Sequence, residues 1–253
     1  MLIARGHHAG QETFGVVDGD GFAPVRDQPF ERVVPAGPQV PLADVELLSP
    51  TRPSRVLVVL GGFLPPDLSV RPPDAEPVLF PKVIPWHLGH DGEVVKPAGL
   101  SGSLDMEAEL ALVIGRKTRS VTAEQGWDSI FGFTVYNDFT AAEFLPARDF
   151  YTAKSMDTLG SCGPWITTDL DRERIEAGIE IIGRVNGEQR QRGTTKRYKF
   201  DPGEIVAHAS RFVTLLPGDI ISLGTPPPAA PVLPGEVCEA EVEGIGVLRN
   251  HVA

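Results

Sequence analysis

Short apolar and alternating segments recur along most of the chain, which is typical of β-strands. Residues 55–60 (RVLVVL), 107–115 (EAELALVIG) and 131–138 (FGFTVYND) are mainly apolar and predict buried strands. Residues 204–214 show a helical spacing of apolar residues, and Thr122 is suited to cap a short helix that follows Thr122. The pattern therefore predicts a mostly β protein with few helices.

Turn residues divide these strands. Gly19-Asp20-Gly21 predicts a hairpin near the N-terminus, and Asn186-Gly187 predicts another between 179–185 and 188–190. Residues 61–85 contain seven prolines, and proline removes the backbone donor that a helix interior or a central strand needs. We therefore predict an irregular surface segment there.

Length and a proline-containing connection indicate two domains. The chain has 253 residues, which suits one small domain attached to a larger one. Residues 35–53 read as an extended connection. We predict a small N-terminal domain at 1–53 and a larger domain at 54–253.

Charge and cysteine content limit the class of partner. The chain carries 23 Lys and Arg against 34 Asp and Glu, so its formal charge of -11 does not favour nucleic acid or an anionic membrane surface. Cys162 and Cys238 form no metal-binding pattern and read as reduced thiols. With no signal segment and no apolar run of membrane-spanning length, we expect a soluble, cytoplasmic protein.

Three acidic residues form a candidate metal site. Glu107 and Glu109 share one face of a buried strand, where their charges repel and lose hydration. Asp138 ends the next strand. Three oxygen ligands without a nearby His or Cys suit Mg²⁺, with Mn²⁺ or Ca²⁺ as alternatives. Two ordinary glutamates at a solvated strand end are the competing interpretation.

Several segments in order resemble the fumarylacetoacetate hydrolase family. The resemblance extends over about residues 55–253, and the N-terminal part resembles the small leading domain of family members. The matching pieces are EAELALVIG (107–115), GFTVYND (132–138), KSMDTLGSCGPWI (154–166), RVNGEQRQ (184–191), LLPGDIISLGTPP (215–227) and PGEVCEAEVEGIGVLRN (234–250).

This resemblance implies an α+β, mostly β fold with a rolled mixed β-sheet, usually in a homodimer. It implies Mg²⁺ held by Glu107, Glu109 and Asp138. It also implies Lys154 near the developing enolate and Thr225 as a contact for a substrate carboxylate. Read alone, the lysine is an ordinary surface charge on a loop and the Thr-Pro-Pro is an ordinary turn. The implied partner is a small-molecule anionic substrate.

The chain departs from the family where hydrolytic members carry G-x-N-Y-x-x-H-x-x-E. Asp67 stands at the His position and Val70 at the Glu position, so the usual water-activating pair is missing. Ala142 and Leu145 replace a substrate-facing Arg and Gln, for which Arg148 is a possible substitute. Candidate replacement bases are Asp67, His87, His90 and Glu76, although the two histidines also read as ordinary loop residues.

We therefore expect a metal-dependent enzyme acting on a small 2-oxo or β-diketo acid through a stabilised enolate. Hydrolysis of a C–C bond, decarboxylation and isomerisation all start from such an enolate. Two alternatives stay open. One is a biosynthetic family member acting on a larger substrate, and the other is a pseudoenzyme that binds metal or ligand without turnover.

Overall fold

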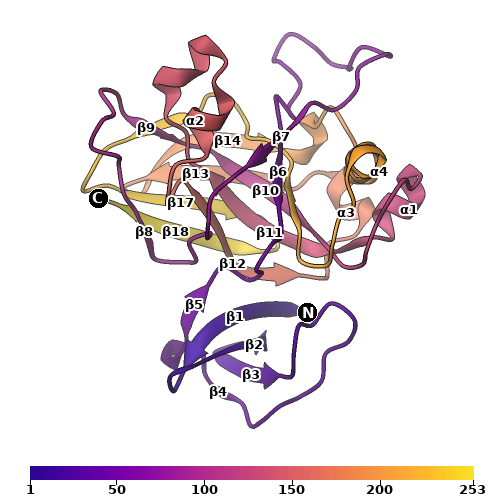
Figure 1. Cartoon of the computed structure of the whole chain (residues 1–253), viewed down its shortest axis with the longest axis vertical. Coiled ribbons are helices and arrows are strands. Elements are labelled where there is room, and N and C mark those ends of the chain that lie inside the picture. Colours follow the sequence, from indigo (N-terminus) through magenta and orange to yellow (C-terminus); the bar gives the residue numbers. More distant parts are fainter.

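The protein is described by a computed structural model of all 253 residues (Figure 1). One sheet of eleven strands runs through both predicted domains in the order β4-β3-β2-β1-β12-β11-β10-β15-β6-β7, with β5 also paired to β1. Its N-terminal strands are β1 (Leu2–His8), β2 (Gln11–Asp18), β3 (Gly21–Val25), β4 (Val40–Pro41) and β5 (Glu46–Leu48). The predicted turn joins β2 to β3, and Gly19 there has a φ of 55°. A 3-10 helix, η1 (Leu42–Asp44), precedes β5.

The buried centre of this sheet is β10 (Ala108–Ile114), between β11 (Ile130–Asp138) and β15 (Ile220–Ser222). Every residue of β10 is buried, and its side chains alternate between two apolar clusters as the sequence predicts. The remaining strands of the large sheet are β6 (Val56–Val59), β7 (Leu79–Lys82) and β12 (Gly160–Thr167).

A five-stranded sheet, in the order β14-β13-β17-β18-β8, packs over one face of the large sheet, and the larger apolar cluster lies between them. Its strands are β8 (Gly92–Val94), β13 (Glu180–Val185), β14 (Glu188–Thr194), β17 (Val237–Val242) and β18 (Gly246–Val252). The predicted Asn186-Gly187 turn joins β13 to β14, with both residues at positive φ. A two-stranded sheet pairs β9 (Leu104–Met106) with β16 (Ala230–Val232).

Four short α-helices lie at the margins of the sheets (Figure 1). They are α1 (Ala123–Trp127), α2 (Phe150–Lys154), α3 (Arg172–Ala177) and α4 (Pro202–Phe212), accompanied by the 3-10 helices η2 (Ala142–Ala147) and η3 (Thr195–Arg197). Thr122 caps α1 as predicted. The helix predicted at 204–214 begins two residues earlier, because Asp201 caps it and Pro202 occupies its first turn. No helix combines the length and apolar character that crossing a membrane requires.

The prediction of a mostly β fold with mixed sheets is confirmed, and the prediction of an irregular segment at 61–85 is wrong in part. Part of the proline-rich segment forms a strand, β7, which pairs with β6. Pro81 is tolerated there because β7 is the last strand of the sheet, so one side of its backbone needs no partner.

Candidate metal centre

Two neighbouring strands bring the three predicted carboxylates together. Glu109 lies on β10, Glu107 directly precedes that strand, and Asp138 ends β11. The backbone N–H of Asp138 donates to the Glu107 carbonyl at 3.0 Å. One oxygen from each side chain lies within 4.8 Å of the others. Such a group of hard oxygen donors suits Mg²⁺, Mn²⁺ or Ca²⁺.

Lys154 bridges two of these carboxylates. Its Nζ donates to Glu107 Oε2 at 2.8 Å and to Asp138 Oδ2 at 2.5 Å, so the side chain is held as an ammonium. It ends helix α2, so the prediction of a loop position is wrong. The cap of this helix explains the difference, since the Asp149 side chain accepts the Thr152 N–H at 3.0 Å.

A second lysine, absent from the sequence-based site, completes the cluster. Lys82 ends β7, is buried, forms an ion pair with Asp138 and donates to the Phe139 carbonyl at 3.1 Å. Burial lowers the pKa of Lys82, and the Asp138 carboxylate opposes that shift. The run Leu79-Phe80-Pro81-Lys82 is the only sequence signal for it, and the surrounding prolines obscure that signal.

Glu109 is the carboxylate without a cation of its own. Its Oε2 accepts from Ser222 Oγ and from the Gly224 N–H, at 2.5 and 3.0 Å. Burial, together with the Asp138 and Glu107 carboxylates, raises the pKa of Glu109 to about 8. With Glu109 ionised, three carboxylates and two lysines carry one uncompensated negative charge, so a divalent cation that displaces the Glu109 proton would fit this donor set.

A cavity of about 530 Å³ opens beside the carboxylates and includes both predicted substrate contacts. Arg148 follows η2, is exposed, and its guanidinium forms no hydrogen bond or ion pair with the protein. The Thr225 hydroxyl donates its hydrogen to the Ala108 carbonyl at 3.1 Å and accepts from Gln191 Nε2 at 3.0 Å. Thr225 therefore has no free hydrogen for a substrate carboxylate.

Gln191 is a second residue that the sequence analysis did not identify. It is buried on β14, where its Nε2 also contacts the Pro226 and Pro228 carbonyls at 3.0 and 2.9 Å. Its Oε1 accepts the Ala108 N–H at 3.0 Å. This single amide fixes the turn that carries Thr225 against the start of β10.

The four candidate bases do not converge on the carboxylates. Asp67 is exposed in the proline-rich segment and does not line the cavity. Glu76 is exposed and pairs with Arg211 at 2.7 Å, and His90 Nδ1 accepts the Arg249 N–H at 3.3 Å. His87 lies elsewhere, in a second cavity.

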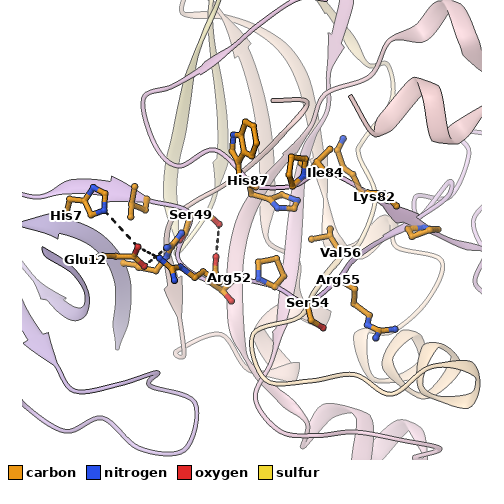
Figure 2. A pocket seen from close by; sticks show the side chains of 18 residues that line it. His7, Glu12, Ser49, Arg52, Ser54, Arg55, Val56, Lys82, Ile84 and His87 are labelled. Atoms are coloured by element: carbon orange, nitrogen blue, oxygen red, sulfur yellow. Dashed lines mark hydrogen bonds and ion pairs between the residues drawn. The ribbon is translucent and has the colours of Figure 1, made fainter. Parts of the chain in front are cut away.

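This second cavity, of about 660 Å³, separates the N-terminal strands from residues 81–87 (Figure 2). Figure 2 shows the His87 ring between an end formed by His7 and Glu12 and an end formed by Arg55. Lys82 also lines this cavity, although its Nζ bonds to Asp138. Lys82 therefore lies between this second cavity and the carboxylate cluster.

We expect His87 to make the stability of the protein depend on pH. Burial, with Lys82 nearby, lowers the pKa of His87 from 6.5 to about 3, and Nε2 is buried without a partner. Below pH 6.5 the unfolded chain therefore binds a proton that the folded chain excludes, so stability is lost as the pH falls. Between pH 8 and pH 5 this costs about 2 kcal/mol.

The comparison variant is His87→Phe, which keeps an aromatic ring against Tyr136 and cannot titrate. Urea unfolding at pH 8 and pH 5 should show a loss in the wild type that exceeds the loss in the variant by about 2 kcal/mol. Equal losses in both proteins would mean that His87 is protonated in the folded state.

Comparison with known proteins identifies the family. Residues 65–253 match "Fumarylacetoacetate (FAA) hydrolase C-terminal", and residues 1–50 match "Rv2993c-like, N-terminal". Protein Rv2993c of Mycobacterium tuberculosis is 36% identical over 100% of this chain and 98% of its own. The human mitochondrial oxaloacetate tautomerase FAHD2A is 31% identical over 98% of this chain and 88% of its own.

Solved structures agree with this assignment. The 5-carboxymethyl-2-hydroxymuconate delta-isomerase of Mycobacterium smegmatis is 34% identical with a TM-score of 0.90, covering 100% of this chain and 99% of that chain. A maleylpyruvate hydrolase from Sphingobium sp. SYK-6, solved with manganese(II) and pyruvate, is 26% identical with a TM-score of 0.80 over 100% and 99% of the two chains. With the family's domain matched over residues 65–253 and relatives aligned along nearly its whole length, this chain belongs to the fumarylacetoacetate hydrolase family.

Proposed function

We propose that this protein is a divalent-metal-dependent isomerase or tautomerase that transfers a proton through the enol form of a small 2-oxo acid. One observation carries the proposal: three carboxylates and an ammonium line a cavity that contains no His and no other carboxylate. Such a site supports an enolate and lacks the usual base for activating water.

Each residue has a separate part in this proposal. Glu107, Glu109 and Asp138 would hold the metal, with Mg²⁺ as the first candidate and Mn²⁺ or Ca²⁺ as alternatives. When bound, the ion supplies Lewis acidity to a 2-oxo acid. Lys154 adds positive charge for the oxygen that becomes negative on enolisation. Arg148 and Leu60 line the cavity and are exposed, so solvent reaches the cavity, and water would take up the proton from carbon and return it.

The relatives include enzymes of the proposed kind. One is called an oxaloacetate tautomerase and another a delta-isomerase of a hydroxymuconate, whereas a more distant one is called a maleylpyruvate hydrolase. The exposed Asp67 and the absence of a His in the cavity favour proton transfer over hydrolysis in this chain.

Solvent exchange tests the proton transfer. Oxaloacetate, acetylpyruvate and a 2-hydroxymuconate-type diene acid are incubated in D₂O with Mg²⁺ or with chelator and followed by NMR, with buffer as the background. We expect deuterium exchange or double-bond migration above background with Mg²⁺ only. Cleavage of acetylpyruvate would contradict the proposal, because it requires a water-activating base, and loss of CO₂ from oxaloacetate would indicate decarboxylation instead.

Lys154→Gln isolates the contribution of the ammonium. The amide retains a hydrogen-bond donor without the charge, so the exchange rate should fall by about 10²-fold to 10³-fold. Lys96→Gln, a change away from the cavity, is the matched control and should leave the rate unchanged. If Lys154→Gln keeps the full exchange rate, the charge of Lys154 does not contribute to the reaction.

A homodimer and a cytoplasmic location stay predictions. Size-exclusion chromatography with light scattering would measure the mass of the particle in solution and so test the homodimer.

A further inference from the structure

Beside the carboxylates, part of the cavity wall is apolar. It is formed by Val58 and Leu60 from the region of β6, Phe80 from β7, Leu145 from η2 and Phe150 from α2. Phe80 and Phe150 stack with their ring centroids 5.5 Å apart and an angle of 24° between the rings. Four elements thus contribute apolar side chains to the lining of the cavity.

The cavity offers little to a second anionic group. Lys154 is already shared by two carboxylates, and the hydroxyl hydrogen of Thr225 is donated to the protein. Arg148 is the one lining cation without a protein partner, and it lies exposed at the rim. A carboxylate placed against Phe80, Leu145 and Phe150 would lose hydration that only the exposed Arg148 at the rim could replace, which is unfavourable.

We infer that the substrate is a 2-oxo acid with an apolar carbon tail, and that this tail packs against Phe80, Leu145 and Phe150. The inference rests on the proposed function, because the carboxylate and ketone of the ligand must lie at the metal centre for its tail to reach this wall. The wall then selects the substrate by excluding water from the tail rather than by pairing charges.

Two ligands of equal length show whether the cavity prefers an apolar tail or a charged one. 2-Oxohexanoate ends in a methyl group, and 2-oxohexanedioate ends in a second carboxylate. Their dissociation constants are measured by calorimetry on the full chain with Mg²⁺, with oxalate as a probe that reaches only the metal end. We expect 2-oxohexanoate to bind about 10-fold more tightly than 2-oxohexanedioate.

Variants of the wall test the contact directly. Phe150→Ala should weaken 2-oxohexanoate binding by about 10-fold and leave oxalate binding unchanged, which also shows that the variant folds. Leu145→Arg should reverse the preference between the two tailed ligands. Tyr151→Ala is the matched control, since Tyr151 neighbours Phe150 on α2 but is 66% exposed and does not line the cavity.

The outcomes distinguish this inference from the proposed function. If oxalate fails to bind with Mg²⁺, the metal centre and hence the proposed function are wrong. If oxalate binds but 2-oxohexanedioate binds as tightly as 2-oxohexanoate or more tightly, the apolar tail is wrong and Arg148 recognises a second carboxylate. Equal binding of 2-oxohexanoate by wild type and Phe150→Ala would also overturn it.

Discussion

Glu109→Gln is expected to remove metal binding and to lower the proton-exchange rate by about 10³-fold or more, because it takes one charged oxygen from the metal centre. The Gln carbonyl oxygen can still accept from Ser222 and Gly224, so the local fold is retained. Titration calorimetry with Mn²⁺ and the deuterium-exchange assay measure the two effects.

The stability of this variant gives an independent measurement. Above pH 8, where Glu109 is ionised, this buried carboxylate has no cation partner, so its replacement by an amide removes an unfavourable charge. In the presence of chelator, Glu109→Gln should therefore unfold at the same urea concentration as the wild type or a higher one. Glu124→Gln on the exposed surface of α1 is the control for a simple charge change. Unchanged Mn²⁺ affinity in Glu109→Gln would exclude the carboxylates as the metal site.

Lys82→Met is expected to destabilise the protein by about 3–5 kcal/mol when no metal is present, which is typical of breaking a buried ion pair by removing one partner. Asp138 would keep Lys154 as its only cation and would lose half of the charge that balances it. Methionine approximates the length of the lysine stem, so the loss reflects charge rather than an empty space. Urea unfolding in chelator measures the change.

Added metal should recover part of this loss. The cluster has a formal charge of -1 with both lysines and -2 without Lys82, so a divalent cation interacts more favourably with the variant. Unfolding repeated with Mn²⁺ should therefore show a smaller difference from the wild type. Lys117→Met, on the exposed surface, should change stability by less than about 0.5 kcal/mol in either condition. A similarly small change in the stability of Lys82→Met would mean that the ion pair between Lys82 and Asp138 does not stabilise the protein.

The sequence predicts where the carboxylates lie because their positions follow from the two-residue alternation of side chains along a β-strand. Alternation along one strand places Glu107 and Glu109 on one face, and Asp138 ends the strand that pairs beside it. The helix cap at Thr122 and the Asn186-Gly187 turn are likewise decided by neighbouring residues.

The rest of the site depends on contacts between distant segments. Lys82 reaches Asp138 only because β7 joins the edge of the sheet, and proline density gave the opposite expectation for that segment. Thr225 is unavailable to a substrate because its hydroxyl donates to the Ala108 carbonyl. Gln191 lies on the five-stranded sheet and hydrogen-bonds to Thr225, in the turn after β15 of the large sheet. No pattern in the sequence reports such distances.

The continuity of the large sheet has a consequence for the N-terminal domain. Leu2 and Ile3 of β1 pair with Thr167 and Ile166, so this domain occupies the outer side of β12. A chain lacking residues 1–50 would expose unpaired backbone N–H and C=O groups along that strand and uncover the apolar side of Ile166. Open strands of this kind recruit other chains. We therefore expect the N-terminal strands to limit aggregation by covering this side of β12.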